Sequence, residues 1–202
     1  MSQIDSPNVI PPFASPLPAR VPKSEFVAGR LSLAFCNTVA LPDAADRLGD
    51  AAALMGWADR AGFKAFAPPA PDVFTGLLEV REILRVIFTA LATGRAPDAA
   101  ALDRLAALAP PLHLSWNDAE NRAEPQPQDL DPLGSLRDAI VRDAIALLTG
   151  PDVIRIKQCP AEDCRWFFFD TSKNGKRRWC AMSDCGVKAK VNRYRGRHMA
   201  AF

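Results

Sequence analysis

The sequence predicts an α+β protein in two parts, a mixed α/β body followed by a small cysteine-rich module. Helical periodicity recurs in long segments such as 71–94, and short segments such as 30–39 alternate between two faces in a mostly apolar environment, as strands do. Four of the five cysteines fall within one short stretch near the C-terminal end. We therefore divide the chain into a proline-rich arm, a body and a C-terminal module, over residues 1–22, 23–150 and 151–202.

The arm and the first two elements of the body are predicted from local signals. The arm holds six prolines and shows no hydrophobic periodicity, which predicts an extended, flexible segment. Residues 30–39, RLSLAFCNTV, alternate between two faces and predict a strand. Residues 50–62 predict a helix that Asp50 caps and Gly62 ends.

The strongest helical signal spans residues 71–94, which begin with Pro71 and end with Gly94. Apolar residues recur there at spacings of three and four, as on the buried face of a helix: Val73, Leu77, Val80, Leu84, Ile87 and Leu91. The same reasoning predicts, in order, a helix over 97–109, a strand over 112–118, a polar loop over 121–132, a helix over 133–150 and a strand over 153–159.

The clustered cysteines predict a metal site. They form two C-x4-C pairs separated by fifteen residues: Cys159, Cys164, Cys180 and Cys185. Two close pairs joined by a longer insert suit tetrahedral zinc, because each pair can occupy a tight turn that directs two thiolates at one point. Since both histidines, His113 and His198, lie outside the pairs, we expect one structural Zn²⁺ per chain, held by four thiolates. The alternative is four buried cysteines that pack as small hydrophobic residues.

The segments around the cysteine pairs predict a treble-clef zinc finger. Residues 165–170 and 176–180 predict a hairpin about an Asn-Gly turn, and residues 187–198 predict a helix after the second pair. A module of about fifty residues buries too little apolar surface to fold firmly without a metal. We expect a small core formed by Trp166, Phe168 and Trp179.

Residues 159–186, CPAEDCRWFFFDTSKNGKRRWCAMSDCG, resemble the CGNR zinc finger. The matching residues are Cys159, Cys164, Trp166, Phe168, Asp170, Ser172, Arg177, Arg178, Trp179, Cys180, Met182, Cys185 and Gly186. Upstream, LSLAFCNTV and LMGWADRAGF resemble the opening of the ABATE domain, through Phe35, Asn37, Thr38 and Trp57. The chain departs from the CGNR motif after Gly186, where Val187 and Lys188 replace Asn and Arg, and lysine lacks the planar fork of arginine.

The resemblance implies an N-terminal mixed α/β ABATE domain that binds a small ligand, a treble-clef finger that binds DNA, and a role as a stress-related transcription regulator. For the ligand we consider a pocket that contains Asn37 and Trp57, with Trp116 as a further candidate. The alternative is that Asn37 caps a turn and that both tryptophans belong to the core.

Positive charge is concentrated in the C-terminal module. The whole chain has a net charge of +2, but residues 155–202 hold twelve basic and four acidic residues, a balance of +8, against −6 for the rest. Such a module attracts polyanions. The candidate DNA contacts are Lys173, Lys176, Arg177, Arg178, Lys188, Lys190, Arg193, Arg195 and Arg197. Because Arg177 and Arg178 alternate on the predicted strand, we expect one of them to face the interior or to pair with Asp170.

The first functional hypothesis is therefore a DNA-binding regulator whose body senses a ligand or pairs subunits. We expect a homodimer, because one finger contacts too few base pairs for good specificity. The alternative is an RNA-binding or protein-interaction module without DNA specificity. An enzyme is not expected, because the chain has no phosphate-binding glycine loop, G-x-S-x-G or H-E-x-x-H motif, and a nuclease-like finger would need nearby histidines. Without a signal-peptide pattern or about 18 consecutive apolar residues, we expect a cytoplasmic protein with no membrane partner.

Overall fold

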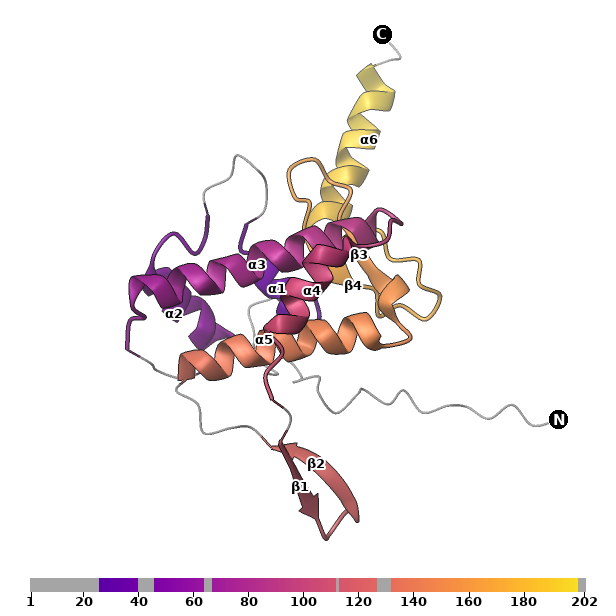
Figure 1. Ribbon diagram of the computed structural model, residues 1–202. Helices are drawn as coiled ribbons and strands as arrows, with labels where there is room; N and C mark the ends of the chain where they lie inside the picture. The colour runs from indigo at the N-terminus through magenta and orange to yellow at the C-terminus, as the bar shows by residue number, and fades with distance from the viewer. Residues whose placement is uncertain (1–25, 40–45, 64–66, 112, 127–131, 200–202) are drawn as a thin grey trace, which may run out of the picture.

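The computed structural model describes residues 26–39, 46–63, 67–111, 113–126 and 132–199 (Figure 1). The predicted arm lies outside these residues. In chain order the elements are α1 (Leu31–Cys36), α2 (Ala51–Arg60), α3 (Pro71–Ala92), α4 (Ala99–Ala107), β1 (His113–Asn117), β2 (Arg122–Gln126), α5 (Pro132–Thr149), a 3-10 turn (Val153–Arg155), β3 (Ile156–Gln158), β4 (Phe167–Phe169), a π-helical turn (Met182–Gly186) and α6 (Val187–Met199).

The longer helices form where the sequence predicts them. Pro71 stands in the first turn of α3, and Gly94 follows its end with a φ of +72°, which glycine adopts without strain. Asp50 caps α2 by accepting a hydrogen bond from the Ala53 amide at 2.7 Å. Within the described ranges, no helix is long and apolar enough to cross a bilayer.

The segment predicted as the first strand is helix α1, so that prediction is wrong. All six residues of α1 are buried, and the helix packs against α3, α5 and β4. A helix surrounded by other elements needs no polar face, so a short apolar segment does not distinguish it from a buried strand. The sequence signal was ambiguous because the burial comes from elements far away in the chain.

The hydrophobic core of the body lies between α1 and the two long helices. The buried apolar residues include Leu77, Val80, Ile83, Leu84, Ile87 and Phe88 on α3 and Leu136, Ile140, Val141, Ala144 and Leu147 on α5. Asp143 is fully buried on α5 and accepts hydrogen bonds from the Ser32 amide and the Arg30 guanidinium, both at 2.8 Å. These bonds satisfy a buried carboxylate and tie α5 to the start of α1.

Strands β1 and β2 form an antiparallel hairpin that leaves the helical body in the direction opposite to α6 (Figure 1). The strand predicted at 112–118 is confirmed as β1, but β2 lies in the segment predicted as a polar loop. That segment lacks the apolar alternation by which strands are recognised. Trp116 pairs with Ala123 and is 60% exposed, so it belongs neither to the core nor to a pocket with Asn37.

The second sheet pairs different strands from those predicted. β3 pairs with β4 in antiparallel fashion, with Lys157 opposite Phe168, and the first cysteine pair lies in the connection between the strands. Residues 176–180, predicted as a returning strand, form no strand. The β3–β4 hairpin and the terminal helix α6 are present, but residues 165–170 and 176–180 do not pair as predicted. The treble-clef classification therefore stays a prediction.

The body and the C-terminal module share one core. Ile156 and Phe167 are 3% and 1% exposed and belong to the same buried cluster as α3 and α5. The Asn37 side chain donates to the Phe167 carbonyl at 2.9 Å and accepts from the Phe167 amide at 2.7 Å. The Phe169 amide donates to the Ala28 carbonyl at 2.8 Å. Apolar packing therefore continues across the predicted boundary near residue 150.

Candidate metal centre

Four cysteines converge from two turns. Cys159 and Cys164 lie between β3 and β4, and Cys180 and Cys185 lie just before α6. The Cys159 amide donates to the Trp166 carbonyl at 2.8 Å, which closes the first turn. The Cys164 and Cys180 sulfurs are 3.5 Å apart, the Cys180 and Cys185 sulfurs are 3.7 Å apart, and all four lie within 4.8 Å of one another.

This geometry fits a zinc ion. Tetrahedral Zn²⁺ with Zn–S bonds of about 2.3 Å holds its sulfurs about 3.8 Å apart. The two sulfur–sulfur distances of 3.5 and 3.7 Å lie close to that value. The donor set is four sulfurs with no histidine, which is typical of closed structural sites. The prediction that these four cysteines form one cluster is confirmed, and the cluster indicates a bound metal of the zinc type.

Proton sharing governs the cluster before a metal binds. The hydrogen bond with Cys164 lowers the pKa of the Cys159 thiol, and the same bond raises the pKa of Cys164. The hydrogen bond with Cys159 also raises the pKa of Cys180. Because zinc binds thiolates, its binding must release the protons that the remaining cysteines hold. Metal affinity should therefore rise with pH.

Family models match the two parts of the chain. Residues 29–151 match the ABATE model, described as "Putative stress-induced transcription regulator", and residues 155–198 match the CGNR zinc finger. The chain belongs to the ABATE family. Its C-terminal module is a CGNR zinc finger. Among curated proteins the chain has no significant match.

The predicted core of the CGNR finger is confirmed. Phe168 is fully buried beside the cysteines, with Trp166 and Trp179 partly buried against the same cluster. The Arg47 guanidinium, from the ABATE part, lies 5.0 Å from the centre of the Trp166 ring. The metal centre thus has neighbours from both parts of the chain, which the sequence did not predict.

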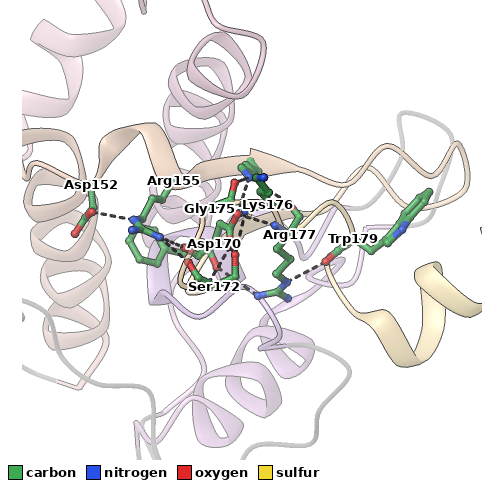
Figure 2. Close-up of polar contacts among 10 residues, drawn as sticks. Asp152, Arg155, Asp170, Ser172, Gly175, Lys176, Arg177 and Trp179 are labelled. Carbon is green, nitrogen blue, oxygen red and sulfur yellow. Dashed lines mark hydrogen bonds and ion pairs between the residues drawn. The ribbon is translucent and has the colours of Figure 1, made fainter. Parts of the chain in front are cut away.

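A buried carboxylate organises the loop between the cysteine pairs (Figure 2). Asp170 is 0% exposed and accepts hydrogen bonds from the Lys157 ammonium at 2.6 Å, the Arg177 amide at 2.9 Å and the Ser172 amide at 2.9 Å. Arg155 donates to the carbonyls of Asp170 and Ser172, both at 3.0 Å. Asp170 therefore fixes the loop that replaces the predicted hairpin. The sequence indicated this residue through its place in the CGNR motif and as a possible partner of Arg177 or Arg178.

The charge on Asp170 stabilises the fold at neutral pH. Burial by itself raises the pKa of Asp170, but the hydrogen bonds from Lys157, Ser172 and Arg177 outweigh it and hold the pKa well below its ordinary value. A lowered pKa means that the carboxylate contributes stability above about pH 4, its unfolded value, and loses it as the pH falls further.

We predict that Asp170→Asn lowers the free energy of unfolding by about 2 kcal/mol at pH 7, because a neutral amide replaces a charged acceptor. Urea unfolding of both proteins between pH 8 and pH 3, compared at each pH at equal zinc content, measures this difference. The difference should shrink below about pH 4, because Asp170 of the unfolded wild-type chain then gains a proton while the folded carboxylate still holds its charge. A difference that stays constant across this range would contradict the role given to the charge.

The candidate DNA contacts differ in their surroundings. Seven are exposed: Lys173, Lys176, Arg178, Lys188, Lys190, Arg193 and Arg195. Arg177 is half-buried, and its guanidinium donates to the carbonyls of Trp179 at 3.0 Å and of Cys180, with the Phe168 ring 4.7 Å away. Its charge is therefore used inside the finger, as expected for one of the two neighbouring arginines. The Arg197 side chain lies outside the described part of the structure.

Asn37 and Trp57 lie in the core, where their partners are protein groups. Asn37 is 3% exposed, and its amide is occupied by the Phe167 backbone. Trp57 is 2% exposed and stacks with Phe26, with ring centres 5.7 Å apart. The cavity that both residues border measures about 10 Å³, room for one water molecule at most. This arrangement does not support a small-ligand site at Asn37 and Trp57.

Proposed function

We propose that this chain regulates transcription by binding duplex DNA through its CGNR finger, with zinc as a structural ion and with no catalytic role. The observation that carries the proposal is the density of exposed basic side chains on the finger. Six of them have no ion-pair partner among the described residues: Lys173, Lys176, Arg178, Lys190, Arg193 and Arg195. The seventh, Lys188, lies 3.2 Å from Asp184 and 3.5 Å from Asp163.

The loop that carries three of these cations is ordered in advance of binding. Asp170 and Ser172 fix its backbone, and Arg177 joins it to the second cysteine pair. The Arg178 guanidinium lies 5.7 Å from the centre of the Trp179 ring. Holding cations in place lowers the entropy lost on binding, so such a loop suits contacts with phosphate groups.

We also propose that the body senses a small ligand or pairs subunits, and two of its surface features support these roles. A groove of about 610 Å³ lies between α3, α4 and α5, with an apolar floor that includes Leu77 and Ile83 and with Arg104 and Arg137 at its edge. This groove, rather than Asn37 and Trp57, supports a ligand-sensing role. The exposed Leu114 and Trp116 on β1, each 60% exposed, support pairing of subunits or binding of a protein partner.

Duplex mobility shift across a salt series tests the proposal. If about five side chains neutralise phosphates, the logarithm of affinity should fall against log salt with a slope of about −4.5. The triple change Lys173→Glu, Lys176→Glu and Arg178→Glu should abolish retardation while zinc content stays at one per chain. Arg104→Glu, an exposed basic residue of the body, is the matched control and should bind like wild type. Absence of retardation at low salt by the zinc-loaded protein would favour the RNA-binding or protein-interaction alternative.

A further inference from the structure

Helix α6 is the most solvent-exposed helix of the chain, and it extends away from the rest of the molecule (Figure 1). Its main packing partner is the π-helical turn that precedes it. Its described side chains, up to Arg195, are all exposed except Ala189, which is partly buried. Three of the exposed residues are large and hydrophobic: Val187, Val191 and Tyr194, at 50%, 39% and 61% exposure. These three side chains present an apolar surface to solvent.

The apolar residues form one stripe with cations on both sides. Val187, Val191 and Tyr194 follow one another at spacings of four and three, so they lie on one face of the helix. At about 100° per residue, Lys190 lies about 70° to one side of this stripe and Arg195 about 70° to the other. Arg193 lies about 130° away, on the far side. The sequence of α6 contains no acidic residue.

This charge pattern argues against a second copy of the chain as the partner. Two α6 helices packed through their apolar stripes would bring the flanking cations together with no acidic residue on either helix to pair with them. A duplex major groove has the opposite charge and a matching shape. It is about 12 Å wide, admits one α-helix, and carries phosphates along both edges and base edges with thymine methyl groups along its floor.

We infer that α6 enters the major groove, with Val187, Val191 and Tyr194 against base edges and with Lys190 and Arg195 on the phosphates of the two strands. The inference rests on the proposed function. It adds which helix binds the duplex, which groove the helix enters and which side chains contact the bases. A helix of 13 residues is about 20 Å long and covers about six base pairs. The buried Cys185 lies two residues before the start of α6, so the metal centre fixes the position from which the helix projects.

The test uses the full zinc-loaded chain and a duplex that it selects from a random-sequence pool. Replacing thymidine by deoxyuridine in the bound stretch removes only the methyl group in the major groove, and we expect affinity to fall about fourfold for each methyl group buried. Dimethyl sulfate treatment should interfere with binding at guanine N7, in the major groove, and not at adenine N3, in the minor groove. Val191→Ala should abolish the sensitivity to deoxyuridine while leaving the salt slope unchanged.

The flanking cations have a matched control on the same helix. Lys190→Ala and Arg195→Ala should each reduce the magnitude of the salt slope by about 1, because each removes one phosphate contact. Arg193→Ala, which removes the same charge from the far side of α6, should change it by less than half as much. Zinc content and melting temperature of each variant establish that the finger remains folded.

Two results would overturn the inference and leave the proposed function intact. One is DNA binding that is insensitive to deoxyuridine and to guanine N7 methylation, with Lys190→Ala and Arg195→Ala behaving like Arg193→Ala. The other is a dimer that Val191→Ala dissociates in sedimentation while DNA affinity stays the same, which would make the stripe a protein interface. Absence of any DNA binding at low salt would remove the proposed function and this inference together.

Discussion

Replacing Cys180 with serine is expected to release zinc and to unfold the CGNR finger. The Cys180 sulfur lies 3.5 Å from that of Cys164 and 3.7 Å from that of Cys185, so it contacts both turns of the site. A neutral hydroxyl is a poor replacement for a thiolate ligand. Binding of structural zinc contributes about 10–16 kcal/mol in comparable small modules, which matches or exceeds the whole stability of a typical domain.

Elemental analysis of the purified protein should find one zinc per chain in wild type and none in Cys180→Ser. Cys36→Ser is the matched control, since Cys36 is as buried as the cluster but lies in α1, and burial raises its thiol pKa well above the usual range. It should keep one zinc and lose only modest stability. Retention of stoichiometric zinc by Cys180→Ser would contradict the assignment of the site.

The loss of zinc should also reach the body. Phe167 of β4 lies in the body core, and its ring centre is 6.1 Å from that of Phe88 on α3. Because this core is continuous, the two parts should melt in one transition rather than in two. Chelation should accelerate hydrogen exchange at α1 amides, which lie against β4.

Features that depend on local spacing could be predicted from the sequence. The cysteine pairs are short turns whose ligands are set by four intervening residues, and Asp50, Pro71 and Gly94 mark helix ends by their own conformational preferences. The cores of α3 and α5 follow from periodicity for the same reason, except at Val73, which was predicted on the buried face of α3 and is 46% exposed. One of the two neighbouring arginines was expected to face the interior, and that residue is Arg177, although the strand on which the expectation rested does not form.

Features that depend on distant partners could not be predicted. The residues of α1 form a helix because α3, α5 and β4 surround them, and nothing within those six residues encodes that environment. Likewise, β4 pairs with β3 rather than with residues 176–180, because Asp170 draws the following loop toward Lys157 and Arg177. Asn37 was noticed as a polar residue at the end of an apolar segment, but its partner is 130 positions away.

Asn37 leads to the second large expected effect. Its side chain hydrogen-bonds to both the amide and the carbonyl of Phe167, as the backbone of a neighbouring strand would. These two bonds join the ABATE part to the finger. Asn37→Ala leaves a buried N–H and a buried carbonyl without partners. Each such group costs about 1–3 kcal/mol, so we expect the free energy of unfolding to fall by about 4 kcal/mol.

Urea unfolding of the zinc-loaded proteins measures this loss, and Asn117→Ala provides a matched control. The Asn117 side chain also accepts two backbone hydrogen bonds, from Ala119 at 3.0 Å and Glu120 at 3.1 Å, but water can replace it in that exposed turn. Its loss should cost less than about 1 kcal/mol. Asn37→Asp should be at least as damaging as Asn37→Ala at pH 7, because a carboxylate oxygen would then face the Phe167 carbonyl. Equal, small losses for Asn37→Ala and Asn117→Ala would show that the Asn37 side chain contributes little to holding the finger and the ABATE part together.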